Sequence, residues 1–455
     1  MAELVVIGAG PAGVRAAATL AKAGRRVVLI DENLRIGGQI YRQPPPGAER
    51  PAAALYGFEA AKAVAIHRAL DGLGDRIDYR PETLVWNARG RVLDVTGPRG
   101  AERLEFDRLV LATGATDRSI PFPGWTLPGV FSLGGAQIAL KAQGCAIGRR
   151  VVFAGTGPLL PLVAYQYAKA GATVAAVLDT SSFANKLKAA PGLVNLPKLF
   201  AKGLYYLAEL KRRGVPVIEG VEGFAVEGTA RPEAITWRRG GETRRIACDA
   251  VGAGFGLRSE TQLADLLGCA FAFDDLTRQW LPVKDADGRA SERHIYLAGD
   301  GAGIAGADAA ELAGERVALT ILGDLGAAVD GGRVAVLDRG LARIQRFRRA
   351  IEAAFPFPHH FHAAIPDDLT ICRCEGVSAG DLRRNVEGRE AREMNRLKAY
   401  SRLGMGRCQG RMCASAGAEL LSHWRGVELE AVGRLRGQAP VKPIPVAASS
   451  PEEAA

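Results

Sequence analysis

The sequence contains no uninterrupted apolar run near the roughly 18 residues that a membrane-spanning helix needs, so we expect no transmembrane segment. Glycines interrupt the apolar residues at its N-terminus, and we therefore expect no signal peptide. There are only seven cysteines, an odd number. Without an export signal, this number argues against a disulfide framework and for a reducing compartment. We expect a cytoplasmic protein whose thiols are reduced or bound to metal.

The composition excludes a disordered chain. Hydrophobic residues make up 48% of the sequence, and 56 of its 455 residues are glycine. This is typical of a large α/β chain, with length for about three domains. Part of the net charge of +10 lies in residues 333–349, which contain six arginines and one aspartate. A solvated helix face explains this run better than an anionic partner does, and we expect no nucleic-acid partner.

Residues 4–32 have the pattern of a strand, a glycine turn, a helix and a second strand. An apolar run leads into Gly8-x-Gly10-x-x-Gly13, and a second apolar run ends on Asp31. Glycines at this spacing allow a tight turn, close approach of the backbone to a pyrophosphate, and close packing of helix on strand. The N–H groups at the helix start favour a phosphate anion, and the Asp31 carboxylate can accept hydrogen bonds from a ribose. The pattern predicts a dinucleotide site.

A second unit of the same kind begins near residue 150, so the chain contains an internal repeat. The turn after its first strand reads Gly155-Thr156-Gly157-Pro158. The third glycine is replaced by Leu160, and Asp179 stands one residue beyond the expected acidic position. This eroded fingerprint leaves two interpretations open: a second bound nucleotide, NAD(P) or ATP, or a turn kept for architecture alone.

Three further segments place glycine next to predicted strands or turns. They are Gly37-Gly38-Gln39, Thr113-Gly114 and Gly299-Asp300. Glycine suits a backbone that passes close to a ligand, although a plain surface turn is the alternative for the first segment. The Asp300 carboxylate could bind sugar or ribityl hydroxyls, and its alternative role is to cap the following helix.

Four cysteines lie in two close pairs near the C-terminus: Cys372 with Cys374, and Cys408 with Cys413. Four thiolates form a ligand set for a 2Fe–2S cluster or a structural zinc ion. Zinc knuckles usually have pairs about two to four residues apart, and Cys-x-Cys is too tight for most of them. The spacing therefore favours iron–sulfur, and glycines before Cys408 provide backbone N–H groups for the cluster sulfurs.

Other residues that could bind metal carry weaker signals. Cys145, Cys248 and Cys269 are isolated, and we expect them to be core thiols. Residues 355–362 contain three histidines, but prolines interrupt the run, so the histidines cannot share one helical face. An interface loop is favoured there over a metal site. Residues 331–365 as a whole look like a linker that begins with an arginine-rich helix.

The glycine motifs, in this order, resemble the flavoproteins with two dinucleotide-binding domains, the glutathione-reductase-like superfamily. The resemblance covers about residues 1–325 and implies an α/β fold with two Rossmann-type domains, FAD in the first and usually NAD(P)H in the second. The cysteine pairs that mark disulfide reductases are missing, so we expect no thiol–disulfide chemistry. The implied FAD contacts are Gly8, Ala9, Gly10, Pro11, Ala12, Gly13, Asp31, Glu32, Gly38, Gln39, Val85, Thr113, Gly114, Gly299 and Asp300.

The C-terminal motifs ICRCEGV (371–377) and RLGMGRCQGRMC (402–413) resemble the bacterioferritin-associated-ferredoxin-like 2Fe–2S domain. They are most similar to the version fused to the alpha subunit, which is the flavoprotein subunit, of octopine and nopaline oxidases, hydrogen cyanide synthase and related amino-acid dehydrogenases. The C-x4-C pair departs from the C-x2-C of the free-standing ferredoxin. The resemblance implies that the four paired cysteines hold a 2Fe–2S cluster in a small, mainly helical domain.

These resemblances predict the division of the chain. The segments are a discontinuous FAD-binding domain (1–117 and 246–330), a second NAD(P)- or nucleotide-binding-like domain (118–245), a linker (331–365), a 2Fe–2S domain (366–430) and a proline-stiffened tail (431–455).

The resemblance also implies an FAD-dependent oxidoreductase subunit that acts on CH–NH or CH–NH2 donors within a hetero-oligomer. A glycine-oxidase-like flavoprotein beta subunit would oxidise an amino acid or opine. Electrons would then pass through the 2Fe–2S cluster to or from the FAD of this chain, and on to an acceptor such as a quinone. A small ferredoxin-like subunit is a second candidate partner. Through such a complex, the protein could lie peripheral to the inner membrane.

The catalytic residues cannot be named from the sequence. No acid–base pair or nucleophile constellation assigns substrate chemistry to this chain. Two alternatives stay open: a self-sufficient NAD(P)H:acceptor flavin oxidoreductase, and a non-catalytic assembly or regulatory subunit with zinc at its C-terminus.

Overall fold

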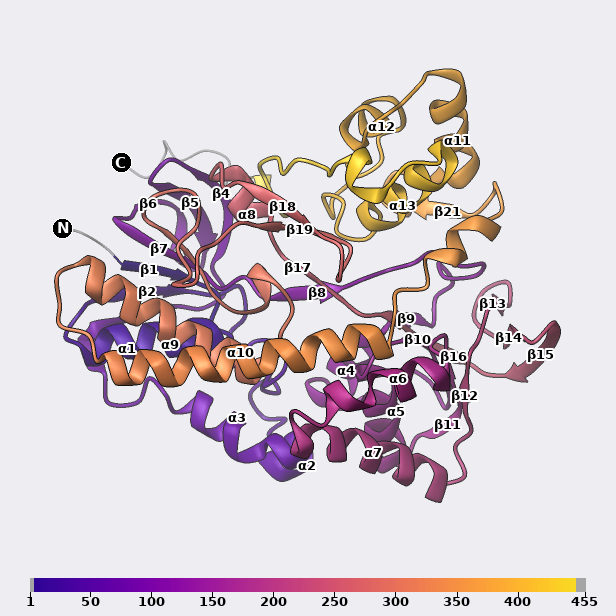
Figure 1. Cartoon of the computed structure of the whole chain (residues 1–455), viewed down its shortest axis with the longest axis horizontal. Helices are drawn as coiled ribbons and strands as arrows, with labels where there is room; N and C mark the ends of the chain where they lie inside the picture. Colours follow the sequence, from indigo (N-terminus) through magenta and orange to yellow (C-terminus); the bar gives the residue numbers. More distant parts are fainter. Residues whose placement is uncertain (1–3, 447–455) are drawn as a thin grey trace.

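The computed structural model describes residues 4–446 as two α/β domains and a small helical domain (Figure 1). The helical domain, labelled α11 to α13 in the figure, lies above the second α/β domain. The predicted fold class is confirmed: two Rossmann-type units are followed by a mainly helical C-terminal domain. No helix of residues 4–446 is both long enough and apolar enough to cross a membrane.

The first domain is built on a five-stranded parallel sheet in the order β20-β7-β1-β2-β3. Strands β1 and β2 are buried at every position because helices α1 and α9 cover one face of the sheet and an antiparallel meander (residues 84–105) with α8 covers the other. Helix α1 packs on α9. The elements are β1 (Leu4–Ile7), α1 (Pro11–Lys22), β2 (Val27–Ile30), α2 (Ala52–Tyr56), α3 (Ala60–His67), β3 (Ile77–Arg80), β7 (Arg108–Leu111), α8 (Gln262–Leu266), β18 (Phe271–Asp274), β19 (Gln279–Pro282), β20 (Ile295–Leu297) and α9 (Ala307–Asp324).

The second domain repeats this plan in a parallel sheet of order β12-β11-β10-β16-β9. Its elements are β9 (Val130–Ser132), α4 (Leu133–Lys141), β10 (Arg150–Thr156), α5 (Leu159–Lys169), β11 (Thr173–Asp179), α6 (Phe183–Leu193), α7 (Pro197–Arg212), β12 (Val217–Glu219) and β16 (Ala250–Phe255). Strand β16 pairs with β10 just as β7 pairs with β1. The second domain therefore continues past the boundary expected at residue 245, because β16 returns to the centre of its sheet.

Each domain also carries an antiparallel three-stranded meander, and two short strands join the domains. The meanders are β4 (Leu84–Arg89), β5 (Val92–Gly97) and β6 (Gly100–Glu105) in the first domain, and β13 (Gly223–Glu227), β14 (Ala234–Arg239) and β15 (Glu242–Ala247) in the second. The connecting strands β8 (Ala115–Asp117) and β17 (Leu257–Ser259) pair with each other. They run between the two halves of the molecule in Figure 1.

The expected linker begins with a long helix, α10 (Gly331–Ala354), which packs on α9 of the first domain and on α6 of the second. Figure 1 shows α10 running along both domains. Its arginines make surface contacts: Arg333 pairs with Glu315 at 2.6 Å, and Arg343 donates to the carbonyl oxygen of Asn195 at 2.9 Å. The helix therefore braces the two domains against each other.

The C-terminal domain shares an apolar core with the second domain. Phe361, in the short helix η4 (His359–Ala364), has its ring 5.6 Å from that of Phe224 and 6.1 Å from that of Phe255. Trp125 donates from Nε1 to the carbonyl oxygen of Thr370 at 2.7 Å. The elements of the domain are β21 (Thr370–Cys372), β22 (Val377–Ser378), α11 (Ala379–Gly388), α12 (Met394–Ser401), α13 (Ala414–Arg425) and η5 (Leu429–Val432). The histidine-rich segment thus lies at an interface.

Replacing Phe361 with alanine should loosen the contact between the C-terminal and second domains. Loss of a buried phenylalanine typically lowers the free energy of unfolding by about 3–5 kcal/mol, and Phe361 is only 9% exposed. We expect a loss near about 3 kcal/mol, measured by denaturant unfolding followed by tryptophan fluorescence. Phe58→Ala is the matched control, because Phe58 is 64% exposed. An equal loss in both variants would contradict the shared core.

The described part of the predicted tail, up to residue 446, packs first on the C-terminal domain, where Val432 is buried, and then on the first domain. Val441 is buried, and its N–H donates to the carbonyl oxygen of Trp86 at 2.9 Å. The Lys442 ammonium pairs with Glu32. The rest of the predicted tail lies outside the described residues.

Candidate functional site

The first glycine turn lies between β1 and α1, at the carboxyl end of the first sheet, where open α/β sheets bind ligands. Gly8 has a φ of 101°, and a Cβ there would lie 2.3 Å from the carbonyl oxygen of Ala112. A Cβ on Gly13 would lie 1.8 Å from the carbonyl oxygen of Gly8. Helix α1 follows Gly10 at once, with Pro11 at its first position. The turn has the close packing that the sequence predicts.

The Gly-Gly segment crosses this turn. The N–H of Gly37 donates to the carbonyl oxygen of Ala9 at 2.8 Å. A Cβ on Gly38 would lie 2.9 Å from Cα of Gly10, so the two backbones touch. Gln39 is exposed beside them. The structure therefore brings residues 37–39 to the phosphate end of the predicted FAD site.

The Gly-Asp segment meets the same helix start. A Cβ on Gly299 would lie 2.8 Å from Cβ of Ala12. The Oδ1 atom of Asp300 accepts hydrogen bonds from the N–H groups of Ala305 and Gly306, both at 2.9 Å. Asp300 thus stabilises the loop before α9. This role is close to the alternative prediction, in which Asp300 caps the following helix. The residue also lies next to the predicted flavin turn.

Asp31 lies at the carboxyl end of β2 and is bonded to the glycine turn. Its Oδ2 accepts from the N–H of Ala9 at 2.6 Å, and its Oδ1 accepts from the N–H and side-chain amide of Asn33, each at 2.7 Å. Burial raises the pKa of Asp31, and these hydrogen bonds oppose the rise. The carboxylate is therefore held against the glycine turn, with its oxygens oriented by these bonds, and its contact with a ribose stays a prediction.

The predicted contacts Glu32 and Val85 lie on different elements: Glu32 follows Asp31 after β2, and Val85 lies in β4. Glu32 is exposed and pairs with Lys442. Val85 is buried in the core of the first domain, so only its backbone can face a ligand. The neighbouring Trp86 carbonyl accepts from Val441, which brings the C-terminal segment to the edge of β4.

The second glycine turn has the same close backbone packing as the first, but the residues at its third glycine position and its acidic position differ. A Cβ on Gly155 would lie 1.8 Å from the carbonyl oxygen of Gly254, so packing of β10 on β16 alone requires this glycine. Leu160 is fully buried in the domain core. Asp179 accepts from the Lys186 ammonium at 2.6 Å, and the same ammonium pairs with Glu219. The acidic position is thus already neutralised by a lysine.

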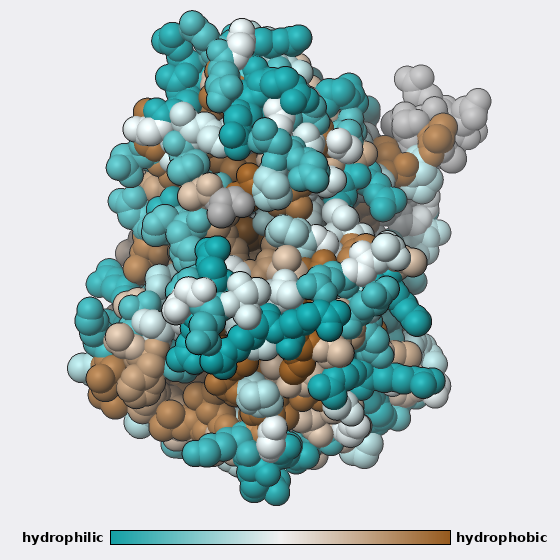
Figure 2. All heavy atoms as spheres, turned by 90° about the vertical axis from the view of Figure 1, so that its right-hand side faces the viewer, coloured by the Kyte–Doolittle hydropathy of each residue, from teal (hydrophilic) through white to brown (hydrophobic). Residues whose placement is uncertain are grey.

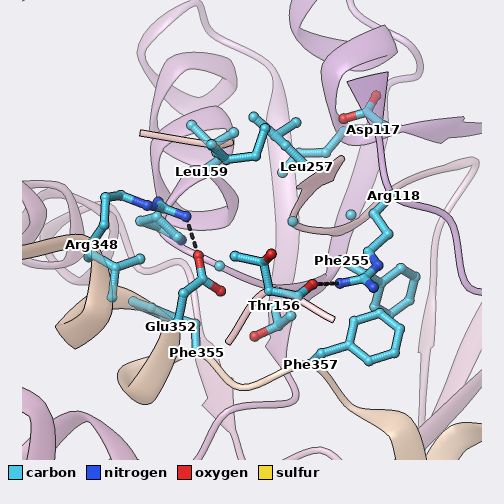
Figure 3. A pocket seen from close by; sticks show the side chains of 18 of the residues that line it. Asp117, Arg118, Thr156, Leu159, Phe255, Leu257, Arg348, Glu352, Phe355 and Phe357 are labelled. Carbon is cyan, nitrogen blue, oxygen red and sulfur yellow. Dashed lines mark hydrogen bonds and ion pairs between the residues drawn. The ribbon is translucent and has the colours of Figure 1, made fainter. Parts of the chain in front are cut away.

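A small cavity adjoins this second turn, lined by Thr156, Gly157 and Pro158 on one side and by the end of α10 on the other (Figure 3). In the figure, Arg348 pairs with Glu352 at one wall, and Arg118 lies beside Phe357 at the other. The cavity measures about 70 Å³. One water needs about 10–15 Å³ by this measure, so the cavity has room for a few water molecules.

The four paired cysteines come together in the C-terminal domain. Thiol–thiol hydrogen bonds link Cys413 to Cys372 and to Cys408, and Cys408 to Cys374. Cys372 and Cys413 are buried, and Cys374 is exposed. The hydrogen bond from Cys413, opposed by burial, lowers the pKa of Cys372 to about 6, and that of Cys408 falls to about 5 for the same reason. Their partner Cys413 has a raised pKa.

Backbone N–H groups point at these sulfurs, as the glycine-rich turn predicts. Gly404 donates to Cys372, and Gly410 donates to Cys408. A Cβ on Gly406 would lie 2.2 Å from Cβ of Cys374, so glycine is required there. Among residues 4–446, no group of three or more His, Cys, Asp or Glu side chains is placed so that it could hold a single metal ion. Four thiols in contact, with N–H donors around them, suit the four-cysteine set of a 2Fe–2S cluster.

The prediction for the isolated cysteines is right for two of them and wrong for the third. Cys248 and Cys269 are buried, and burial raises the pKa of each to about 11. Cys145 is exposed because it lies in the loop after α4, outside the packed helices and strands of the second domain. Of the three clustered histidines, His362 is buried and its pKa is lowered to about 4, first of all by burial.

One segment, residues 257–262, touches both predicted cofactor sites, and its only signal in the sequence is a set of charged residues after a strand. On the flavin side, the Thr113 hydroxyl donates to the carbonyl oxygen of Glu260 at 2.5 Å, and the Glu260 N–H donates to that of Gly114 at 3.0 Å. On the cysteine side, Nε of Arg411 lies 2.6 Å from Oε2 of Glu260. Burial alone would raise the pKa of Glu260, but Arg411 and Arg258 hold it below its usual range.

The fold and the two sites define a class: an FAD-dependent oxidoreductase with an attached 2Fe–2S domain. The chain belongs to the pyridine nucleotide-disulphide oxidoreductase family, whose family model matches residues 2–319, and a BFD-like [2Fe-2S] binding domain model matches residues 370–423. These matches indicate FAD and a 2Fe–2S cluster as cofactors.

Two curated relatives match over nearly the whole chain. One is an opine oxidase subunit from Rhizobium meliloti, to which the chain is 37% identical, with 98% of this chain and 86% of the relative covered. The other is hydrogen cyanide synthase subunit HcnB of Pseudomonas aeruginosa, also 37% identical, with 98% and 97% covered. Among solved structures, L-proline dehydrogenase from P. horikoshii has the same fold, with a TM-score of 0.71 at 20% identity over 99% of this chain and 79% of that chain.

Proposed function

We propose that this chain is the electron-transfer subunit of a hetero-oligomeric dehydrogenase or oxidase that acts on the C–N bond of an amino acid or opine. A partner flavoprotein subunit of the glycine-oxidase type would oxidise the substrate. This chain would pass the electrons between that partner and an acceptor such as a quinone. The flavin would be bound at the first glycine turn, and the cluster by Cys372, Cys374, Cys408 and Cys413.

The observation that carries this proposal is the contact between the two sites within one chain. Residues 257–262 bond to two of the predicted FAD contacts, Thr113 and Gly114, and through Arg411 to the cysteine loop. When bound, FAD supplies two-electron chemistry and the cluster supplies one-electron chemistry. Two such groups held by one segment suit a relay, and they do not require an acid, a base or a nucleophile from this chain.

The chain's own residues bind and orient the cofactors. The glycine turn and the start of α1 offer N–H groups and the positive end of a helix to the pyrophosphate, and Asp31 faces the ribose position. The N–H groups of Gly404 and Gly410 stabilise negative charge on the sulfurs. The chain therefore tunes and positions the carriers, and substrate choice falls to the partner.

Two further observations support a partner subunit. The opine oxidase and hydrogen cyanide synthase relatives are both named as subunits. Figure 2 shows an apolar patch, in brown, low on one face of the molecule, where the second domain lies. Exposed apolar patches mark protein interaction sites. The exposed large apolar residues of α6, α7 and their neighbourhood are Phe58, Phe183, Leu187, Val194, Leu199, Leu204 and Tyr205.

A stopped-flow experiment separates this proposal from the NAD(P)H-dependent alternative. The second glycine turn favours that alternative, but the Asp179–Lys186 pair opposes it, because the carboxylate is already bound by a lysine. We expect anaerobic NADH or NADPH to leave the flavin absorbance of the isolated chain unchanged, while the partner flavoprotein with its substrate reduces it. Dithionite is the control that the flavin is competent. Fast, complete bleaching by NADH or NADPH without a partner would establish the reductase and refute the relay.

A further inference from the structure

A guanidinium at the junction of the two sites is held by the loop that carries the cysteines. Arg258, at the centre of β17, donates from Nη1 to the carbonyl oxygen of Arg411 at 3.0 Å and reaches that of Gly410 at 3.4 Å. Both carbonyls belong to the loop between Cys408 and Cys413. Arg258 is mostly buried, and its charge interacts with both of those cysteines.

The charges around Arg258 do not cancel. Arg411 is paired with Glu260 at 2.6 Å, with side chains only 13% and 12% exposed. Glu260 also interacts with Arg258, so two arginines share one carboxylate and leave a net positive charge beside the loop. Buried charges are screened weakly by salt and water, and an arginine stays protonated at any physiological pH.

We propose that Arg258 is a positioning residue that fixes the cysteine loop against the flavin domain and raises the reduction potential of the cluster. One-electron reduction adds one negative charge to the cluster, and a nearby fixed positive charge stabilises the reduced form. Net charge and hydrogen bonding around the sulfurs are established determinants of cluster potential. This inference rests on the proposed ligand set of four cysteines.

The test is the midpoint potential of the cluster, measured in the full chain by an anaerobic redox titration followed by electron paramagnetic resonance. Arg258→Met should lower the equilibrium constant for reduction about tenfold, which is about 59 mV for a one-electron couple. Arg258→Lys, which keeps the charge, should stay close to the wild type. Glu260→Gln removes a negative charge from the same junction and should shift the potential upward. If these variants only loosened the packing, we would not expect Arg258→Met and Glu260→Gln to shift the midpoint potential in opposite directions.

Arg434→Met is the matched control, because Arg434 docks the C-terminal segment on Asp265 at 2.6 Å through a similarly buried ion pair. It should leave the potential within the error of the titration. Equal shifts in Arg258→Met and Arg434→Met, or shifts of one sign in Arg258→Met and Glu260→Gln, would overturn the inference. If the Arg258→Met protein takes up no iron, the test depends on Glu260→Gln alone. An unchanged or lower midpoint potential in Glu260→Gln would then overturn the inference. Iron and sulfide analysis of the wild type tests the ligand set separately.

Discussion

Serine in place of Cys413 is expected to remove the iron–sulfur cluster from the protein while the flavin stays bound. Cys413 is fully buried and contacts both Cys372 and Cys408, so its loss breaks two of the three thiol contacts. A hydroxyl is a poor substitute for a thiolate toward iron. Iron and acid-labile sulfide should fall from about two per chain to background, and the signal of the reduced cluster should disappear.

The control for this variant is Cys145→Ser, because Cys145 is exposed and lies in the second domain, outside the cysteine-rich domain. It should keep wild-type iron, sulfide and flavin. In the assembled enzyme, Cys413→Ser should still bind FAD but should no longer deliver electrons to the one-electron side of the relay. Full iron and sulfide in Cys413→Ser would show that the four cysteines are not the ligands.

Alanine in place of Gly10 is expected to weaken FAD binding without unfolding the chain. Gly10 has an extended backbone with φ of −75°, which any residue adopts, and a Cβ there would come no closer than 3.8 Å to Gly38. The added methyl group would instead separate the backbone from the pyrophosphate. Loss of hydrogen bonds to a charged group costs about 1.5–3 kcal/mol, so FAD should bind about 10–100-fold more weakly.

Equilibrium titration of the apoprotein with FAD measures this effect. Gly203→Ala is the control, since Gly203 lies in α7 and a Cβ there would meet nothing within 4 Å. It should bind FAD normally. Gly13→Ala offers a contrast: its Cβ would collide with the Gly8 carbonyl, so we expect it to unfold the turn itself. Wild-type FAD affinity in Gly10→Ala would place the pyrophosphate elsewhere.

The features that the sequence predicts well are those in which one residue type is required locally. Gly8 and Gly13 can be predicted because each lies against a backbone carbonyl group and has no space for a side chain. The four paired cysteines can be predicted as cluster ligands because pairs of thiolates at short spacing have few functions other than binding metal. The alternation of strands and glycine turns predicts both parallel sheets, because each turn marks the end of a buried strand.

The features that the sequence does not predict depend on packing between distant segments. Glu260 and Arg411 are 151 residues apart, and nothing in either neighbourhood indicates that they pair. The exposure of Cys145 is not predictable because an isolated thiol carries no signal of burial. Strand β16 falls on the wrong side of the expected domain boundary because a glycine-rich apolar run fits either sheet, and pairing with β10 decides the choice.

The shared core of the second and C-terminal domains has a consequence for how the chain can be divided. The Phe224, Phe255 and Phe361 rings form one packed group, and Trp125 is bonded to the first strand of the C-terminal domain. Cutting the chain before residue 355, so that Phe361 stays with the cysteine-rich part, would expose aromatic surface on both fragments. The cysteine-rich part is therefore not a transplantable module: a free-standing protein of this type would need polar replacements at the faces that Phe224 and Phe255 cover here.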